Sequence, residues 1–146
     1  MINVNLSQLY NIASDNNIEV DNFDTKAVDS FSMPHIIVLN KKGLKRTLDK
    51  KMHMAHELGH CLTWSFYHST SKYDTRSRME CRADRWVIHN LIPFFEFYAA
   101  LQSGLSENWQ LAEYFEVTED YIIKAKTMYE QKIYDLQKGM ERSEKD

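Results

Sequence analysis

Two histidines one helical turn apart, with a glutamate beside the first, are the residues of this chain best suited to act together chemically. In the segment HELGH, His56 and His60 are separated by four positions and Glu57 directly follows His56. On a helix, side chains at positions i and i+4 lie on one face, so both imidazoles can reach one metal ion. The carboxylate of Glu57 would lie next to that metal and could accept a proton from water. The segment predicts a zinc site for peptide hydrolysis, with Glu57 as the catalytic base.

The alternative interpretation of this segment is a core helix that carries two solvated histidines. Gly59 favours the metal site, because a glycine inside a helix costs about 1 kcal/mol relative to alanine and usually has a packing reason. Close approach of another part of the backbone is one such reason.

A catalytic zinc ion requires a third protein ligand and one open coordination position. Phe66 stands where a metzincin would have its third histidine, which excludes that class. A second predicted helix carries Glu80 and, one turn later, Asp84. We expect Glu80 to bind the metal and Asp84 to accept a hydrogen bond from a ligand histidine and fix its tautomer. The alternative for Glu80 is a capping box with Ser77 at the start of that helix. The alternatives for Asp84 are an i, i+4 partnership with Glu80 and a surface ion pair with a nearby arginine.

The second predicted helix also carries a family resemblance. Its sequence, ECRADRWVIHNLIP, resembles the E-x-E-A-x-x-F-A-x-x-L-L-x-P pattern of the ImmA/IrrE metallopeptidases, which belong with the gluzincin-like zinc peptidases. The matching positions are Glu80, Ala83, Leu91 and Pro93, whereas Arg82, Trp86, Val87 and Asn90 depart from the pattern.

This resemblance implies one zinc ion per chain, held by His56, His60 and Glu80, in a cytoplasmic phage-borne or bacterial protein. It also implies a substrate or partner, a repressor of the helix-turn-helix class. Cleaving or inactivating that repressor would switch on a prophage, a mobile element or a stress response. A noncatalytic regulator that binds the repressor without cutting it is the alternative.

The expected fold class is α+β and mainly helical, with a small β-sheet, the HExxH helix, the second metal-ligand helix and a helical carboxy-terminal half. We expect a single domain over residues 1–146, with the sheet and zinc-binding core in 1–93, a helical part in 94–138 and a frayed tail in 139–146. The predicted elements are a helix over 6–13, strands in NNIEVDNF and PHIIVLN, a helix capped by Thr47, a helix from Ser77 to just before Pro93, a helix in PFFEFYAAL, and a helix-turn-helix-like pair after residue 105.

Composition and charge narrow the choice of partners. The net charge is −3, and the segment 105–123 contains five acids and neither lysine nor arginine, so a phosphate backbone would be repelled and direct DNA binding is disfavoured. The sequence lacks a recognisable signal peptide and any long apolar run, and it has only two cysteines, each expected as a small buried residue of a helix. These features favour a cytoplasmic protein without a membrane partner.

The donor that would stabilise the oxyanion of the reaction stays unknown at this stage. His68 and Tyr73 are candidates only because they lie between the two metal-ligand helices. His53 is close to His56 on the helix face, but it is not expected to bind the metal, because zinc already has three better candidates.

Overall fold

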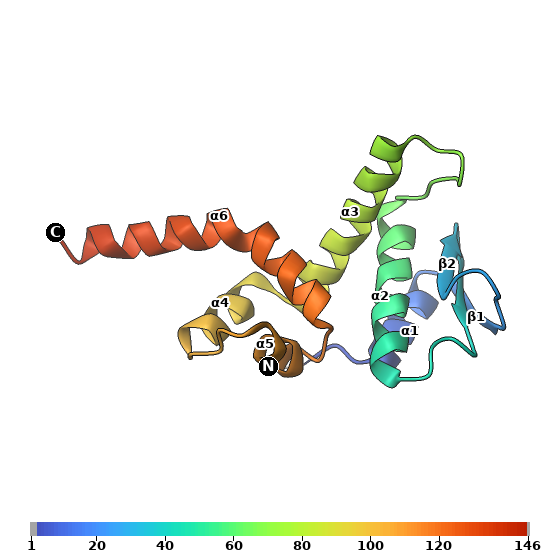
Figure 1. The fold of residues 1–146 in the computed structure, drawn as a ribbon, viewed down its shortest axis with the longest axis horizontal. Coiled ribbons are helices and arrows are strands. Elements are labelled where there is room, and N and C mark those ends of the chain that lie inside the picture. The colour runs from blue at the N-terminus through green and yellow to red at the C-terminus, as the bar shows by residue number, and fades with distance from the viewer. Residues whose placement is uncertain (1–2, 146) are drawn as a thin grey trace. The chain divides into compact units, whose positions relative to one another are not determined.

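The computed structural model describes residues 3–145, which form a three-stranded sheet and six helices (Figure 1). The chain divides into two compact units, one ending at Leu91 and the other beginning at Ile92. The elements are, in order, α1 (Leu6–Asp15), β1 (Glu19–Phe23), β2 (Ser30–Met33), β3 (Ile36–Asn40), α2 (Thr47–Thr63), α3 (Tyr73–Leu91), α4 (Phe94–Gln102), α5 (Asn108–Phe115) and α6 (Glu119–Ser143). The predicted α+β class, mainly helical, is confirmed.

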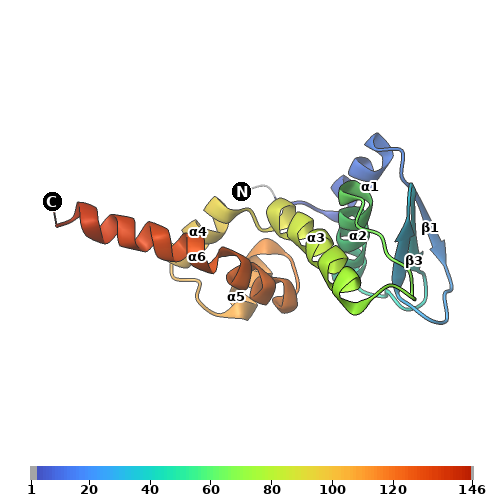
Figure 2. The same ribbon diagram turned by 90° about the horizontal axis from the view of Figure 1, so that it is seen from above.

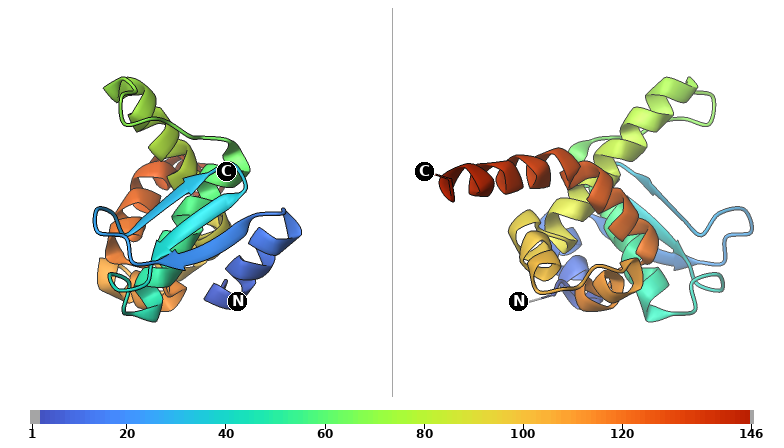
Figure 3. Two further views of the ribbon diagram at one scale, coloured as in Figure 1. Left: turned by 90° about the vertical axis from the view of Figure 1, so that its right-hand side faces the viewer. Right: turned by 60° about the vertical axis from the view of Figure 1, so that its left-hand side comes forward.

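The sheet has β3 at its centre, with β1 parallel on one side and β2 antiparallel on the other. β3 is the most apolar strand, and Ile37, Val38 and Leu39 are buried. Their β-branched and aliphatic side chains suit a strand that is covered. The left view of Figure 3 shows the strands in front of α2. The sequence predicted β1 and β3 but missed β2, which forms one edge of the sheet.

Helix α2 lies between the sheet and α3 (Figure 2), and it therefore forms the centre of the first unit. Met52, Ala55, Leu58 and Gly59 are buried along it, as the apolar periodicity predicted. Thr47 was expected to cap this helix, but that expectation is wrong. The extended residue Arg46 is the N-cap, without a side-chain cap bond, and it forms an ion pair with Asp49 instead.

Helix α3 begins four residues earlier than expected. Tyr73 is its first residue, so Ser77 lies inside the helix and the predicted capping box with Glu80 is wrong. Asp74 lies in the first turn, where a negative charge interacts favourably with the helix dipole. The end at Leu91, before Pro93, agrees with the prediction. Glu80 is consequently in the middle of a regular helix, where its side chain is not needed for capping.

The two cysteines differ in their surroundings. Cys61 of α2 is buried, as expected, and burial first of all raises the pKa of its thiol to about 11. Cys81 of α3 is exposed, so the expectation that it is a small buried residue is wrong. It lies on the side of α3 away from the buried residues Ala83 and Val87.

The second unit has an aromatic core. The ring of Phe97 lies 6.1 Å from that of Phe115 and 5.6 Å from that of Tyr129, whose hydroxyl donates to the carbonyl of Ile92 at 2.9 Å. Glu116 adopts the left-handed conformation, with φ 54°, between α5 and α6. This is the turn position where glycine is most easily accommodated.

Helix α6 continues to Ser143, so it includes part of the segment 139–146 that we expected to fray. The single glycine of that segment, Gly139, is not enough to stop the helix, since it costs only about 1 kcal/mol. Among the helices of residues 3–145, none combines the length and apolar character needed to cross a membrane.

Candidate metal centre and active site

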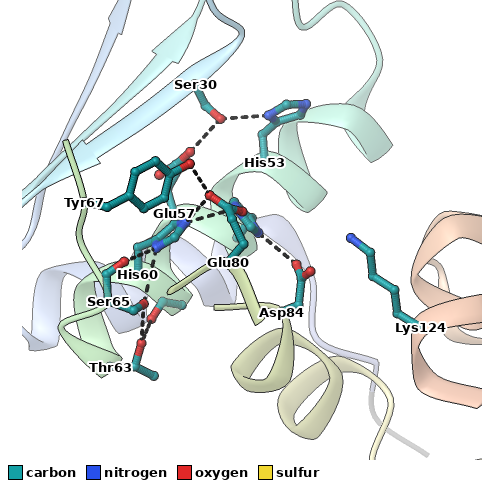
Figure 4. A network of polar contacts seen from close by, with 12 residues as sticks. Ser30, His53, Glu57, His60, Thr63, Ser65, Tyr67, Glu80, Asp84 and Lys124 are labelled. Carbon is teal, nitrogen blue, oxygen red and sulfur yellow. Dashed lines mark hydrogen bonds and ion pairs between the residues drawn. The ribbon is translucent and has the colours of Figure 1, made fainter. Parts of the chain in front are cut away.

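The potential ligand atoms of His56, His60 and Glu80 all lie within 4.8 Å of one another. Figure 4 shows His60 and Glu80 at the centre of this cluster. The two histidine Nε2 atoms lie 3.1 Å apart. Glu80 Oε2 lies 2.8 Å from Nε2 of His56, and its Oε1 lies 3.3 Å from Nε2 of His60. The histidines come from successive turns of α2 and the glutamate from α3, so the packing of the two helices assembles the cluster.

The spacing of these atoms suits a zinc ion. Two ligands bound about 2.0–2.1 Å from a tetrahedral zinc ion lie roughly 3.3 Å from each other. The distances within the cluster range from 2.8 to 3.3 Å, and the donors are two imidazoles and one carboxylate. Three protein ligands leave one coordination position open, as a catalytic zinc site requires. The residues present therefore fit the metal.

Each ligand histidine has an acceptor for its other ring nitrogen. His56 Nδ1 lies 3.1 Å from Oδ1 of Asp84, and His60 Nδ1 lies 2.6 Å from the carbonyl oxygen of Ser65. An acceptor at Nδ1 holds the proton there and leaves the Nε2 lone pair to face the metal. Asp84 thus lies where a residue that orients His56 must lie. The sequence offered no signal for Ser65, because it contributes a main-chain atom.

The way in which α2 ends places the carbonyl of Ser65. Trp64 adopts a left-handed conformation, with φ 50°, and the chain reverses so that the Ser65 amide donates to the carbonyl of His60 at 3.0 Å. The hydroxyl of Thr63 lies 2.7 Å from that of Ser65 and donates to the carbonyl of Gly59 at 2.7 Å. These bonds fix the turn against the last turn of the helix.

The cluster also shifts the pKa values of its members. Burial by itself would lower the pKa of His56, but hydrogen bonds with Asp84 and then Glu80 outweigh burial and raise it to about 9. Hydrogen bonds from His56 and His60 hold the pKa of Glu80 well below its ordinary value. Glu80 is therefore a carboxylate across the physiological range, as a metal ligand must be.

A pocket of about 240 Å³ opens beside the cluster. Glu57 is buried, with 6% of its surface exposed, and lines this pocket together with His60 and Glu80. A carboxylate outside the ligand set therefore shares one cavity with two of the three candidate ligands. The remaining lining residues are Val28, Ser30, Phe31, Ser32, Ser65, Phe66 and Tyr67.

Tyr67 was missed by the sequence analysis, although it precedes one of the proposed oxyanion donors. Its hydroxyl donates to Oε1 of Glu80 at 2.5 Å, and this bond is the first cause that raises the pKa of Tyr67 to about 12. Neither His68 nor Tyr73 is among the residues that line the pocket, and 76% of Tyr73 is exposed. Position in the loop was the only available signal, and it did not indicate that Tyr67 is the tyrosine of this loop that lines the pocket.

His53 does not belong to the metal cluster found among the described residues. Its Nδ1 lies 2.8 Å from the hydroxyl of Ser30, on β2, and that hydroxyl donates to Oε1 of Glu57 at 2.9 Å. The sequence did not indicate Ser30 either, although its hydroxyl is bonded to Glu57.

A small sheet, an HExxH helix and a second helix that supplies a glutamate together form a zincin-like site. The chain belongs to the family described as the IrrE N-terminal-like domain, the M78 peptidases, whose match extends over residues 13–125. The match includes the whole candidate metal centre and confirms the resemblance to the ImmA/IrrE metallopeptidases. No curated protein sequence matches the chain.

Proposed function

We propose that this protein is a zinc-dependent endopeptidase. The observation that carries the proposal is the position of Glu57, a buried carboxylate that shares one pocket with His60 and Glu80 of the metal cluster. When bound there, Zn²⁺ would polarise the scissile carbonyl and lower the pKa of a water molecule. Glu57 accepts a proton from the attacking water and delivers it to the leaving amine, which are the two proton transfers that peptide hydrolysis requires.

The edge strand β2 is suited to hold the peptide beside this site. It pairs with β3 on one side, and its other edge ends the sheet. Such an edge can bind an extended peptide through main-chain hydrogen bonds. Two side chains close to or within the strand, Val28 and Phe31, line the pocket and offer apolar contacts to the peptide.

Tyr67 is the side chain we assign to the oxyanion. Tyr67 lines the pocket and is not one of the candidate metal ligands. Its phenol is a hydrogen-bond donor next to Glu80. In this assignment the phenol turns from Oε1 of Glu80 to the carbonyl oxygen of the substrate, as negative charge develops on that carbonyl oxygen. Donors aimed at that charge are a large contribution to catalysis.

The substrate we propose is a repressor of the helix-turn-helix class, whose cleavage would derepress a prophage, a mobile element or a stress response. Support comes from the ImmA/IrrE family, which is associated with such repressors. An extended linker of the repressor would fit the edge of β2 better than its folded helices. The proposal places the protein in the cytoplasm, where repressors act.

The test compares the parent protein with Glu57→Gln after both have been loaded with zinc. Each is incubated with purified helix-turn-helix repressors encoded beside its gene, and the products are identified by mass spectrometry. We expect the parent to cut at a defined site and Glu57→Gln to be slower by about 10²–10⁴-fold, with an unchanged zinc content. Cleavage by Glu57→Gln at the parent rate would overturn the mechanism.

The same variant separates the noncatalytic alternative, in which binding alone inactivates the repressor. A reporter gene under the control of the repressor measures the biological effect. If Glu57→Gln still derepresses the reporter fully while the repressor stays intact, the protein acts by binding. Loss of derepression together with loss of cleavage supports the endopeptidase.

A further inference from the structure

Glu57 and His53 of α2 are both hydrogen-bonded to Ser30 of the edge strand β2. The hydroxyl of Ser30 donates to Oε1 of Glu57 at 2.9 Å, and the hydroxyl oxygen of Ser30 lies 2.8 Å from Nδ1 of His53. His53 and Glu57 are one turn apart on α2, so Ser30 bridges two side chains of one helix face from the neighbouring strand (Figure 4).

The chemistry of the three groups sets the direction of both bonds. An ionised carboxylate only accepts hydrogen bonds, and a serine hydroxyl has one proton to donate. The hydroxyl proton of Ser30 is therefore donated to Glu57, and the hydroxyl oxygen of Ser30 must accept a hydrogen bond from His53. This requires the proton of His53 to reside on Nδ1.

We propose that Ser30 is a positioning residue for Glu57, and that His53 holds the Ser30 hydroxyl in the direction that this role needs. The proposal rests on the function proposed above, because it assigns a residue to the same reaction. A glutamate side chain has several rotatable bonds, and a general base must be held within hydrogen-bond reach of the proton it takes. Ser30 supplies that restraint with a short side chain on a strand whose backbone is paired with Leu39 of β3.

The sequence of β2 is consistent with this role. The strand carries serine at positions 30 and 32, where side chains reach α2: Ser30 contacts Glu57, and Ser32 forms a hydrogen bond with Cys61. Its apolar residues Phe31 and Met33 are exposed, by 39% and 49%. A strand that served packing alone would place its apolar residues against the helix. Polar residues on the inner face are expected if the strand serves the site.

The first experiment needs no substrate. In zinc-loaded, ¹⁵N-labelled protein at a pH where His53 is neutral, long-range ¹H–¹⁵N spectra report which ring nitrogen carries the proton. We expect Nδ1–H for the parent and Ser30→Thr, and Nε2–H, the form preferred by free imidazole, for Ser30→Ala. An Nε2–H tautomer in the parent would overturn the chain of hydrogen bonds.

The second experiment measures cleavage of an internally quenched peptide mixture by zinc-loaded variants. For Ser30→Ala we expect kcat to fall by about tenfold or more, with KM and zinc content little changed. Ser30→Thr keeps the hydroxyl and should restore kcat. Ser103→Ala is the control, because it also removes a serine hydroxyl, but that hydroxyl donates to the carbonyl of Ala100 and does not line the pocket, so this variant should keep the parent rate.

The outcomes separate this proposal from the peptidase assignment. An active parent whose kcat is unaffected by Ser30→Ala, or a Ser30→Ala protein that loses zinc, would overturn the positioning role. A zinc-loaded parent that cleaves neither the peptides nor the repressors would contradict the proposed function, and the tautomer of His53 would then decide alone whether Ser30 holds Glu57.

Discussion

Gly59 of α2 lies against the main chain of Ala83 in α3. A Cβ added to Gly59 would be 2.6 Å from the carbonyl oxygen of Ala83 and 3.0 Å from its Cα. The two helices are therefore as close as their backbones allow. This proximity lets a glutamate of α3 reach the two histidines of α2, and the packing reason expected for Gly59, close approach of a backbone, is confirmed.

Gly59→Ala should therefore destabilise the protein, although alanine is the better helix former. Helix propensity would favour alanine by about 1 kcal/mol, but overpacking against a backbone costs about 1–3 kcal/mol. We expect a net loss in the free energy of unfolding, measured in urea, and weaker zinc binding because Glu80 is displaced from the histidines.

Gly139→Ala is the matched control for this substitution. Gly139 also lies within a helix, but a Cβ there would meet nothing within 4 Å. The free energy of unfolding of Gly139→Ala should be about 0.5–1 kcal/mol higher than that of the parent. An equal increase in the free energy of unfolding for the two variants would show that the packing of α2 against α3 does not require a glycine at position 59.

Zinc content should separate the roles of the two carboxylates of α3. Elemental analysis of the parent should give about one zinc per chain, and Glu80→Ala should lose it, since two histidines alone do not complete a catalytic site. Asp84→Ala should keep zinc but bind it about 10 to 100-fold more weakly, because His56 loses the acceptor that orients it.

Asp74→Ala provides the control on the same helix, since Asp74 is exposed and lies in the first turn of α3. It should bind zinc like the parent. Full zinc content and affinity in Glu80→Ala would remove Glu80 from the ligand set.

Local periodicity accounts for the part of the site that the sequence predicted. His56, Glu57 and His60 lie within two turns of one helix, so their relative positions follow from helical geometry alone. The place of Glu80 depends on how α2 and α3 pack, which no local pattern determines. Its spacing within a family pattern supplied that information. The carbonyl of Ser65 could not be anticipated, because it depends on the left-handed residue at Trp64.

Strand β2 was missed for a different physical reason. A half-buried strand is recognised by apolar residues that face the core and polar residues that face water. In β2 the serines reach α2 while Phe31 and Met33 are exposed, and the strand is only four residues long. The usual signal is therefore reversed in β2, and Ser30, which donates to Glu57, was missed together with the strand.

Tyr67→Phe should impair turnover more than metal binding. The variant removes one hydroxyl, which donates to Glu80, and retains the ring that lines the pocket. If the phenol stabilises the oxyanion, kcat should fall by about 10²–10³-fold with KM little changed.

Tyr73→Phe is the control for Tyr67→Phe, because Tyr73 is 76% exposed and does not line the pocket. It should have the kinetics of the parent. A Tyr67→Phe protein that turns over normally but has lost zinc would mean that the hydroxyl serves only to hold Glu80.

The effect of pH on folding and on zinc binding should have opposite signs, because both depend on His56. Its pKa is about 9 in the fold, compared with an ordinary value of 6.5. With the metal removed by a chelator, protonated His56 stabilises the fold fully below pH 6.5, and this contribution is lost as the pH rises toward 9. Zinc binds the neutral imidazole, so its apparent affinity should increase about tenfold per pH unit up to about pH 9.

Urea unfolding with chelator and competition titrations with a zinc indicator, both between pH 6.5 and 9, measure the two trends. Glu80 does not contribute to the pH dependence of either property over this range, because its pKa is lowered and it stays ionised. Asp84→Asn removes the charge of the hydrogen-bond partner that raises the pKa of His56, so both trends should become shallower in that variant. A zinc affinity that is constant across the range would mean that His56 is already neutral before the metal binds.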